Sequence, residues 1–355
     1  MKSSQLLFSP KEDFSASLFW VVPLVNQSRA RYLNALGNLP PVFQRTATSH
    51  FSKRLRQCES RPHIGEYLPW LLADVMRIPQ SEKLNQTISG WLSLYFSLLL
   101  LDDLLDGAIQ HSPNHMLTAA ILQQRGLTQM LATSPSPFEL GRCVDSAFDK
   151  AAIAARHEMD RRCGNVIPFK KSEVANLCDK GALLKICAEA LALLSRRPND
   201  SRKIVASFLR PLLTALQLLD DITDCVEDFQ IGAATLPLTL HAEAMKHPHR
   251  FGGGNRYELL SSMILDGSLA NSIQVAISYL SDAVRLTKSH PLFSETRIQN
   301  YTRELTDRAR EAFAIVTECR DQLQREVKLG EAHSKEFSRL VKDTKRRLVI
   351  IMQTT

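Results

Sequence analysis

The sequence predicts an all-α fold, a single bundle of about ten helices around an apolar interior, and three observations lead to it. Apolar residues recur at helical spacing along most of the chain. No segment alternates between apolar and polar residues with a period of two, so almost no β-sheet is expected. Apolar residues make up 44% of the 355 residues, which is ample for a large core, and no low-complexity linker divides the chain.

The helical pattern covers these stretches in chain order: 67–77, 82–106, 116–131, 138–163, 172–195, 201–229, 257–285 and 296–328. Pro, Gly, Ser and Asn mark the breaks between them. Pro211 lies inside one stretch, where we expect it to kink or restart the helix. We expect one domain, with an N-terminal helical extension at 1–50, a motif-bearing core at 51–240 and C-terminal helices at 241–355.

The charge balance limits the classes of partner. Lys and Arg exceed Asp and Glu by 44 to 37, and the surplus is spread along the chain without aromatic interleaving. Nucleic-acid binding is therefore not expected, whereas a basic surface suits a polyanionic substrate that arrives with metal ions. The seven cysteines are scattered without a CxxC pair, which indicates reduced thiols and no structural zinc site.

Targeting signals are not evident either. Pro10, Lys11, Glu12 and Asp13 interrupt any signal-peptide core. The longest uncharged apolar run, ISGWLSLYFSLLLL at 88–101, is too short to span a bilayer. We expect a cytoplasmic, soluble protein with no integral membrane segment.

The first acidic cluster ends an apolar run, LLLLDDLLDGAI at 98–109. On a helix Asp102 and Asp106 share a face, and Asp103 lies beside them. Carboxylates behind buried leucines need a compensating cation, because burying an unpaired charge is costly. One such cluster alone is as consistent with a solvated helix face as with a binding site.

A second cluster, LQLLDDITDCVED at 216–228, repeats the arrangement. Asp220, Asp224 and Asp228 follow one another at i, i+4 and i+8, with Asp221 and Glu227 beside them. Oxygen-only ligands of this kind suit Mg²⁺ shared with substrate phosphates. His and Cys do not converge with them, which argues against zinc or a di-iron centre. Two clusters facing each other would hold a diphosphate through several Mg²⁺ ions, and the leucine-rich side would form a cavity for an apolar tail.

These stretches resemble the two aspartate-rich motifs of the trans-prenyl diphosphate synthase superfamily, whose members have the isoprenoid-synthase fold. Gln217 matches the Gln that the family places three residues before its second motif, and DKGALLKICAEALALL at 179–194 puts Lys180 at the diphosphate-binding lysine. The ending DFQIGAATLPL at 228–238 is similar to that of bacterial members. The resemblance covers about residues 50 to 240. It implies that Asp102, Asp103, Asp106, Asp220 and Asp224 serve catalysis, and that these with Asp221 and Asp228 hold Mg²⁺, three ions in all.

The departures from the family pattern bear on the reaction. Chain-elongating members carry an arginine pair after the first motif, where this chain reads GAIQHSPNHM at 107–116. Their Gly-Lys-Arg-x-Arg-Pro run for isopentenyl diphosphate has only partial counterparts, SKRLRQ at 52–57 and CESRP at 58–62. Gly181 stands where the family has Thr, and Ala233 and Ala234 where it has Lys. The expected function is therefore a Mg²⁺-dependent terpene synthase, similar to bacterial prenyl-synthase-like ones, that ionises a linear allylic diphosphate and releases pyrophosphate.

The helix before Asp102 carries a clue to tail length. Ser97, Ser93 and Gly90 form a stripe of small residues. In the family a bulky residue about five positions before the first aspartate tends to limit the bound chain, so Ser97 and Ser93 would leave room for a C20 or longer tail. Close helix packing explains the stripe equally well. Phe96, Tyr95 or Phe208 would stabilise a carbocation by their π faces or simply pack in the core.

Two alternatives stay open. The first is a trans-prenyltransferase that condenses an allylic diphosphate with isopentenyl diphosphate, with SKRLR as its second phosphate site. The second is a non-catalytic partner subunit of a true synthase, against which the intact aspartates of both clusters argue. A homodimer is compatible with all of these functions.

Overall fold

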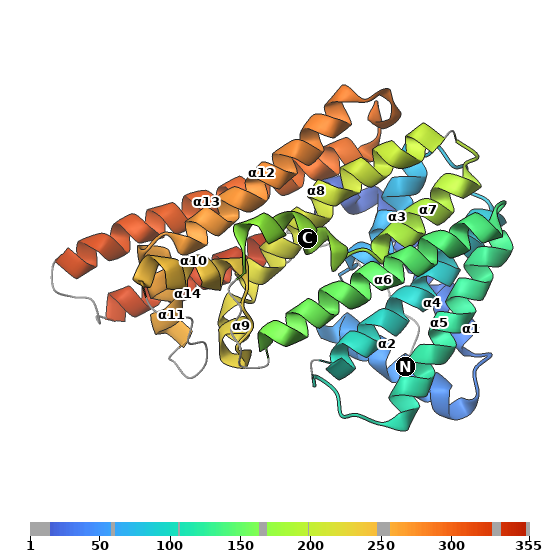
Figure 1. Cartoon of the computed structure of the whole chain (residues 1–355), viewed down its shortest axis with the longest axis horizontal. Coiled ribbons are helices and arrows are strands. Elements are labelled where there is room, and N and C mark those ends of the chain that lie inside the picture. Colours follow the sequence, from blue (N-terminus) through green and yellow to red (C-terminus); the bar gives the residue numbers. More distant parts are fainter. Residues whose placement is uncertain are drawn as a thin grey trace. The chain divides into compact units, whose positions relative to one another are not determined.

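The computed structural model describes residues 15–57, 61–105, 107–162, 169–197, 199–246, 256–328 and 335–352. Within these residues the chain forms fourteen α-helices and three short 3-10 helices and contains no β-strand, which confirms the all-α prediction (Figure 1). The helices outnumber the expected ten or so, chiefly because four of them, at 22–36, 41–57, 236–245 and 335–352, lie outside the periodic stretches, and also because some stretches divide into shorter helices.

The chain divides into two compact units, each built from segments that are distant in sequence. Unit 1 comprises 1–145, 184–205 and 295–298, and unit 2 comprises 146–183, 206–294 and 299–355. The single domain with an N-terminal extension stays a prediction.

Unit 1 contains η2 (Ala16–Val21), α1 (Val22–Leu36), α2 (Pro41–Gln57), α3 (Ile64–Val75), α4 (Glu82–Leu105), α5 (Pro113–Thr133) and α7 (Leu184–Leu194), and the chain begins α6 (Pro137–Arg162) and α8 (Asn199–Thr223) there. Helix α4 packs against α5, α1 and α3. Gly90 of α4 and Gly126 of α5 meet at the crossing with α5, where a Cβ on Gly126 would lie 2.6 Å from the Gly90 carbonyl oxygen. Close packing of the two helices therefore explains why position 90 is a glycine.

A buried ion pair ties α1 to α3 in unit 1. Arg29 Nε lies 2.6 Å from Glu66 Oε1, and both side chains are at most 1% exposed. Glu66 also accepts the backbone N–H of His63, which caps the first turn of α3. Burial raises the pKa of Glu66, but Arg29 outweighs burial and the net pKa is lowered, so this carboxylate stays ionised.

Unit 2 contains the remaining parts of α6 and α8, η3 (Lys171–Asp179), α9 (Cys225–Ile231), α10 (Leu236–Met245), α11 (Arg256–Leu265), α12 (Ser268–Ser289), η4 (Pro291–Phe293), most of α13 (Arg297–Lys328) and α14 (Lys335–Met352). Helix α12 packs on α10 and α11, and α11 also contacts α9 and α14. Ile273, Ala276 and Leu280 of α12 are fully buried, at the helical spacing that the sequence shows.

Three predicted helices have different boundaries in the structure. Helix α8 runs without interruption through Pro211, so of the expected kink or restart the restart does not occur, and the helix ends at Thr223. The stretch 172–195 divides into η3 and α7. The stretch 257–285 divides at Gly267, whose φ of 84° places it in the left-handed region that favours glycine.

Helix α4 is the one described helix that is long and apolar enough to cross a membrane by length and composition. The helix extends beyond the uncharged run 88–101 at both ends. The length of that run alone therefore does not decide whether the helix is too short to span a bilayer. The most apolar part of α4 is 67% buried inside the protein, as expected of a helix that packs in the core.

Candidate functional site

The first acidic cluster lies at the C-terminal end of α4 in unit 1. The helix ends at Leu105, and Gly107, with a φ of 70°, follows in the turn. Asp106 is outside the described residues. The side chain of Asp102 is 65% exposed, whereas that of Asp103 is 9% exposed. The two neighbouring aspartates therefore have different surroundings, although the sequence presents them as equivalent.

Helix α2 supplies the partners of Asp103. His50 Nε2 lies 2.9 Å from one carboxylate oxygen of Asp103, and Arg54 Nη2 lies 2.9 Å from the other. Arg54 also approaches Asp102 to 4.0 Å, and Lys53 donates a hydrogen bond to the carbonyl of Ala108 in the following turn. Burial lowers the pKa of His50 and outweighs the opposing effect of Asp103. Arg54 is thus the main charge that compensates Asp103.

The second acidic cluster lies where α8 ends and α9 begins, in unit 2. Asp224 is the N-cap residue of α9, so the predicted continuous helix is interrupted there. The i to i−4 pattern nevertheless continues, because Asp224 N–H donates to Asp220 O at 3.0 Å and Asp228 N–H donates to Asp224 O at 2.8 Å. The helical register of Asp220, Asp224 and Asp228 is therefore kept across the boundary.

Exposure differs among these aspartates. Asp220 and Asp224 are exposed, Asp228 is half-buried and Asp221 is 5% exposed. Burial raises the pKa of Asp221, and partial burial of the carboxyl raises that of Asp224 although the residue as a whole is exposed. Burial is also the largest cause for Asp228, and the like charges of Asp221 and Asp224 add to it, so that its pKa rises to about 8. Crowded carboxylates of this kind are stabilised by a cation.

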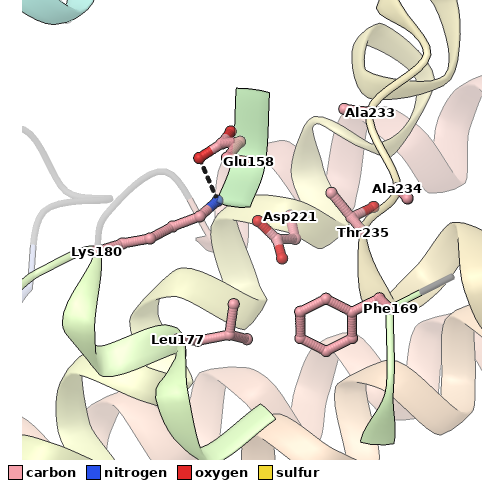
Figure 2. Close-up of a pocket in the computed structure, with 8 residues that line it drawn as sticks. All are labelled: Glu158, Phe169, Leu177, Lys180, Asp221, Ala233, Ala234 and Thr235. Atoms are coloured by element: carbon pink, nitrogen blue, oxygen red, sulfur yellow. Dashed lines mark ion pairs between the residues drawn. The ribbon is translucent and has the colours of Figure 1, made fainter. Parts of the chain in front are cut away.

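Lys180, which follows η3, reaches one end of this cluster. Its ammonium lies 3.0 Å from Glu158 Oε2 of α6, and Figure 2 shows the Asp221 carboxylate beside it. Together with Phe169, Leu177 and residues 233–235 these side chains line a small pocket of about 10 Å³, room for one water molecule. Burial tends to lower the pKa of Lys180, but Asp221 and Glu158 outweigh burial and raise it, so Lys180 stays charged.

Gln217 contacts the second cluster as a donor. Its side-chain amide lies 2.9 Å from Asp221 Oδ1 and 3.5 Å from Asp220 Oδ2. Gln217 and Lys180, which the resemblance singled out, thus converge on Asp221. Lys345 of α14 lies 3.4 Å from Glu227, so the C-terminal helix brings a cation to the same region of unit 2.

The residues present fit a hard divalent cation. No three His, Cys, Asp or Glu side chains among the described residues already converge on one metal-sized point. The available ligand atoms are nevertheless carboxylate oxygens, which Mg²⁺ prefers. The pKa values at the second cluster are raised first by burial and then by repulsion between the carboxylates, and a bound cation would offset both effects. Mg²⁺ binding at these positions stays a prediction.

The serines of α4 and the candidate aromatic residues lie in the core. Ser97 and Ser93 are buried, and their hydroxyls donate to backbone carbonyls of their own helix. Phe96 packs against Tyr32 and Phe51, and Phe208 packs against Phe293. These contacts explain Phe96 and Phe208 as core packing, and the link between Ser97 and tail length stays a prediction.

Sequence reasoning missed two partners of the predicted residues. Glu158 belongs to a long charged helix and stands 22 positions before Lys180, and nothing in one sequence distinguishes it from the acidic residues around it. His50 stands two positions before SKRLR and belongs to no motif. A helical repeat could have found it, since His50 and Arg54 are four residues apart and share one face of α2.

The fold has well-matched counterparts among solved structures. A polyprenyl synthase from Caulobacter crescentus, solved with calcium and isoprenyl diphosphate, matches 87% of this chain and 99% of its own with a TM-score of 0.65 at 16% identity. A geranylgeranyl pyrophosphate synthetase from the archaeon Geoglobus acetivorans matches 81% of this chain and 97% of its own with a TM-score of 0.66 at 16% identity. A heptaprenyl diphosphate synthase from Staphylococcus aureus matches 80% and 97% with a TM-score of 0.61 at 15% identity.

The chain therefore has the fold of the trans-prenyl diphosphate synthases, as the two acidic stretches predicted. No family model matches the sequence. No curated protein matches it either. At these identities the similarity shows the fold, and the reaction has to be argued from the residues.

Proposed function

From the fold that the chain shares with the trans-prenyl diphosphate synthases, we propose that it is a Mg²⁺-dependent enzyme that acts on a linear allylic isoprenoid diphosphate. We further propose that it is a prenyltransferase, which condenses this diphosphate with isopentenyl diphosphate. The sequence alone favours a terpene synthase. The three structural counterparts named above are a polyprenyl synthase, a heptaprenyl diphosphate synthase and a geranylgeranyl pyrophosphate synthetase, which supports the transferase better.

One observation in unit 1 carries the choice of reaction. Helix α2 brings Lys53 and Arg54, the centre of the SKRLR run, to the end of α4 that holds Asp102 and Asp103. In the sequence this run was an incomplete match to an isopentenyl diphosphate site, without its proline. Its position beside the first acidic cluster supports a role in holding a second phosphate group.

The proposed roles of the side chains follow from their surroundings. Asp102 at the first cluster presents carboxylate oxygens to a cation, and so do Asp220, Asp221, Asp224 and Asp228 at the second cluster, whereas Asp103 orients Arg54 and His50. When bound, Mg²⁺ would neutralise the diphosphate and ease its departure. Lys180 adds a charged donor, and Gln217 holds the Asp221 carboxylate in place.

A terpene synthase is the second candidate, and a specific observation favours it. The described part of the loop after the first cluster, 107–112, contains no arginine, and Lys53 is engaged there by the carbonyl of Ala108. Arg54 is likewise engaged by Asp103. If Lys53 serves only to hold the turn and Arg54 only to hold the Asp103 carboxylate, a second diphosphate has no binding site. The allylic carbocation would then lose a proton, cyclise or react with water.

Product analysis separates the two reactions. The protein is incubated with farnesyl, geranylgeranyl or geranylfarnesyl diphosphate and Mg²⁺, with and without isopentenyl diphosphate, and the products are analysed by mass spectrometry. A longer diphosphate that forms only with isopentenyl diphosphate supports the prenyltransferase. A hydrocarbon or alcohol that forms equally well without it supports the terpene synthase. If every substrate is returned unchanged, neither proposal holds.

A further inference from the structure

Glu158 has no assigned role in the proposed function, yet it is the ion-pair partner of Lys180 in unit 2. It comes from the last turn or so of α6, and its carboxylate lies 3.0 Å from the Lys180 ammonium. Both side chains are largely buried, with 29% and 21% exposed. An ion pair that water reaches only partly is screened less than a surface pair, so it holds both groups in place.

The pocket around Lys180 shows how its ammonium is shared. An ammonium has three N–H donors, and Glu158 takes one of them. Asp221 lines the same pocket, and its carboxylate lies beside the ammonium (Figure 2). Among the described residues, the hydrogen bond that Asp221 accepts comes from Gln217 and not from Lys180. One positive charge thus stands between two carboxylates from two different helices, α6 and α8.

We propose that Glu158 is a positioning residue for Lys180. It holds the ammonium at the pocket beside Asp221 and offsets part of its charge, so that Lys180 contributes to binding a diphosphate without retaining the pyrophosphate that remains after the reaction. This inference rests on the proposed function, because it requires that Lys180 meets a diphosphate.

The test is a double-mutant cycle on pyrophosphate binding. Glu158→Gln keeps the size and an acceptor oxygen but removes the charge. Isothermal titration calorimetry of inorganic pyrophosphate is carried out on the full chain, with and without Mg²⁺, for wild type, Glu158→Gln, Lys180→Met and the double variant. We expect Glu158→Gln to bind pyrophosphate about fivefold to tenfold more tightly than wild type, and this gain to vanish in the Lys180→Met background.

Steady-state kinetics give an independent readout. In Glu158→Gln the KM for the allylic diphosphate should fall by a similar factor while kcat does not rise, because tighter binding of the diphosphate does not favour its departure. Glu158→Asp keeps the charge on a shorter side chain and should bind pyrophosphate with an affinity between those of wild type and Glu158→Gln. A merely structural role for Glu158 would not produce this order.

Asp160→Asn is the matched control. Asp160 is on the same helix, pairs with Arg156 at 2.9 Å on an exposed face, and its replacement removes the same charge. We expect it to bind pyrophosphate as wild type does. Equal affinity in wild type and Glu158→Gln, or a gain that persists without Lys180, overturns the inference. If wild type itself fails to bind pyrophosphate with Mg²⁺, the proposed function fails first, and the two outcomes are thus distinguishable.

Discussion

The two adjacent aspartates at the end of α4 should differ sharply in what they contribute to stability. Asp103 makes two contacts of 2.9 Å, one with Arg54 and one with His50, and its side chain is 9% exposed. A hydrogen bond to a charged group contributes about 1.5–3 kcal/mol, and removing one partner leaves the other charge buried without compensation. Since the Arg54 side chain is 20% exposed, part of this energy is screened, and we expect Asp103→Asn to cost about 3 kcal/mol.

Asp102→Asn is the comparison. The Asp102 side chain is 65% exposed and 4.0 Å from Arg54, so its loss should change the free energy of unfolding by less than about 0.5 kcal/mol. With about 2.1 cal/mol/K of unfolding entropy per residue, a chain of 355 residues that unfolds as one loses about 4 °C of Tm for 3 kcal/mol. Calorimetric melts in the absence of metal measure this difference. Equal melting temperatures for the two variants would refute the structural assignment of Asp103.

Three further predictions concern the second cluster and the packing of α4. Because the pKa of Asp228 is raised to about 8, this carboxyl is protonated at neutral pH in the metal-free fold and ionised in the unfolded chain. The stabilisation that comes from protonated Asp228 is therefore lost as pH rises from about 4 through 8. Because the ionised carboxylate binds a cation better, the gain in Tm on adding Mg²⁺ should grow between about pH 6 and pH 9, and a gain independent of pH contradicts this. Gly126→Ala places a Cβ 2.6 Å from the Gly90 carbonyl oxygen and should cost about 1–3 kcal/mol in denaturant titrations, whereas Gly141→Ala, with open space around it, should be neutral or stabilising. Ser97→Phe should shift substrate acceptance toward shorter tails in competition assays; an unchanged chain-length preference in a variant that folds removes the link between Ser97 and tail length.

Periodicity and spacing predicted the helical fold and the position of both acidic clusters, because both are local properties of the sequence. They could not predict that Asp103 turns toward α2 while Asp102 faces solvent. That difference depends on His50 and Arg54, which are about 50 positions away. Periodic spacing likewise could not predict that the helix is interrupted at Asp224, because the i to i−4 hydrogen bonds continue across this boundary and keep the spacing unchanged.

The surroundings of Lys180 were equally beyond reach of the sequence. The family resemblance pointed to Lys180 and Gln217, and the structure does bring both to Asp221. It could not point to Glu158, since a single glutamate on a charged helix carries no signal until the tertiary fold sets it 3.0 Å from the ammonium. Long-range electrostatic partners are decided by packing, which no local pattern encodes.

The central claim is that the carboxylates of both clusters promote departure of a diphosphate from an allylic substrate. Its most direct test is release of pyrophosphate from geranylgeranyl diphosphate in the presence of isopentenyl diphosphate, since both candidate reactions then release it. We predict that pyrophosphate release requires Mg²⁺ and does not occur from isopentenyl diphosphate alone. We also predict that Asp102→Ala and Asp220→Ala each reduce this release at least about a hundredfold while leaving the fold intact. Release that continues unchanged in either variant, or without a divalent cation, would contradict the account.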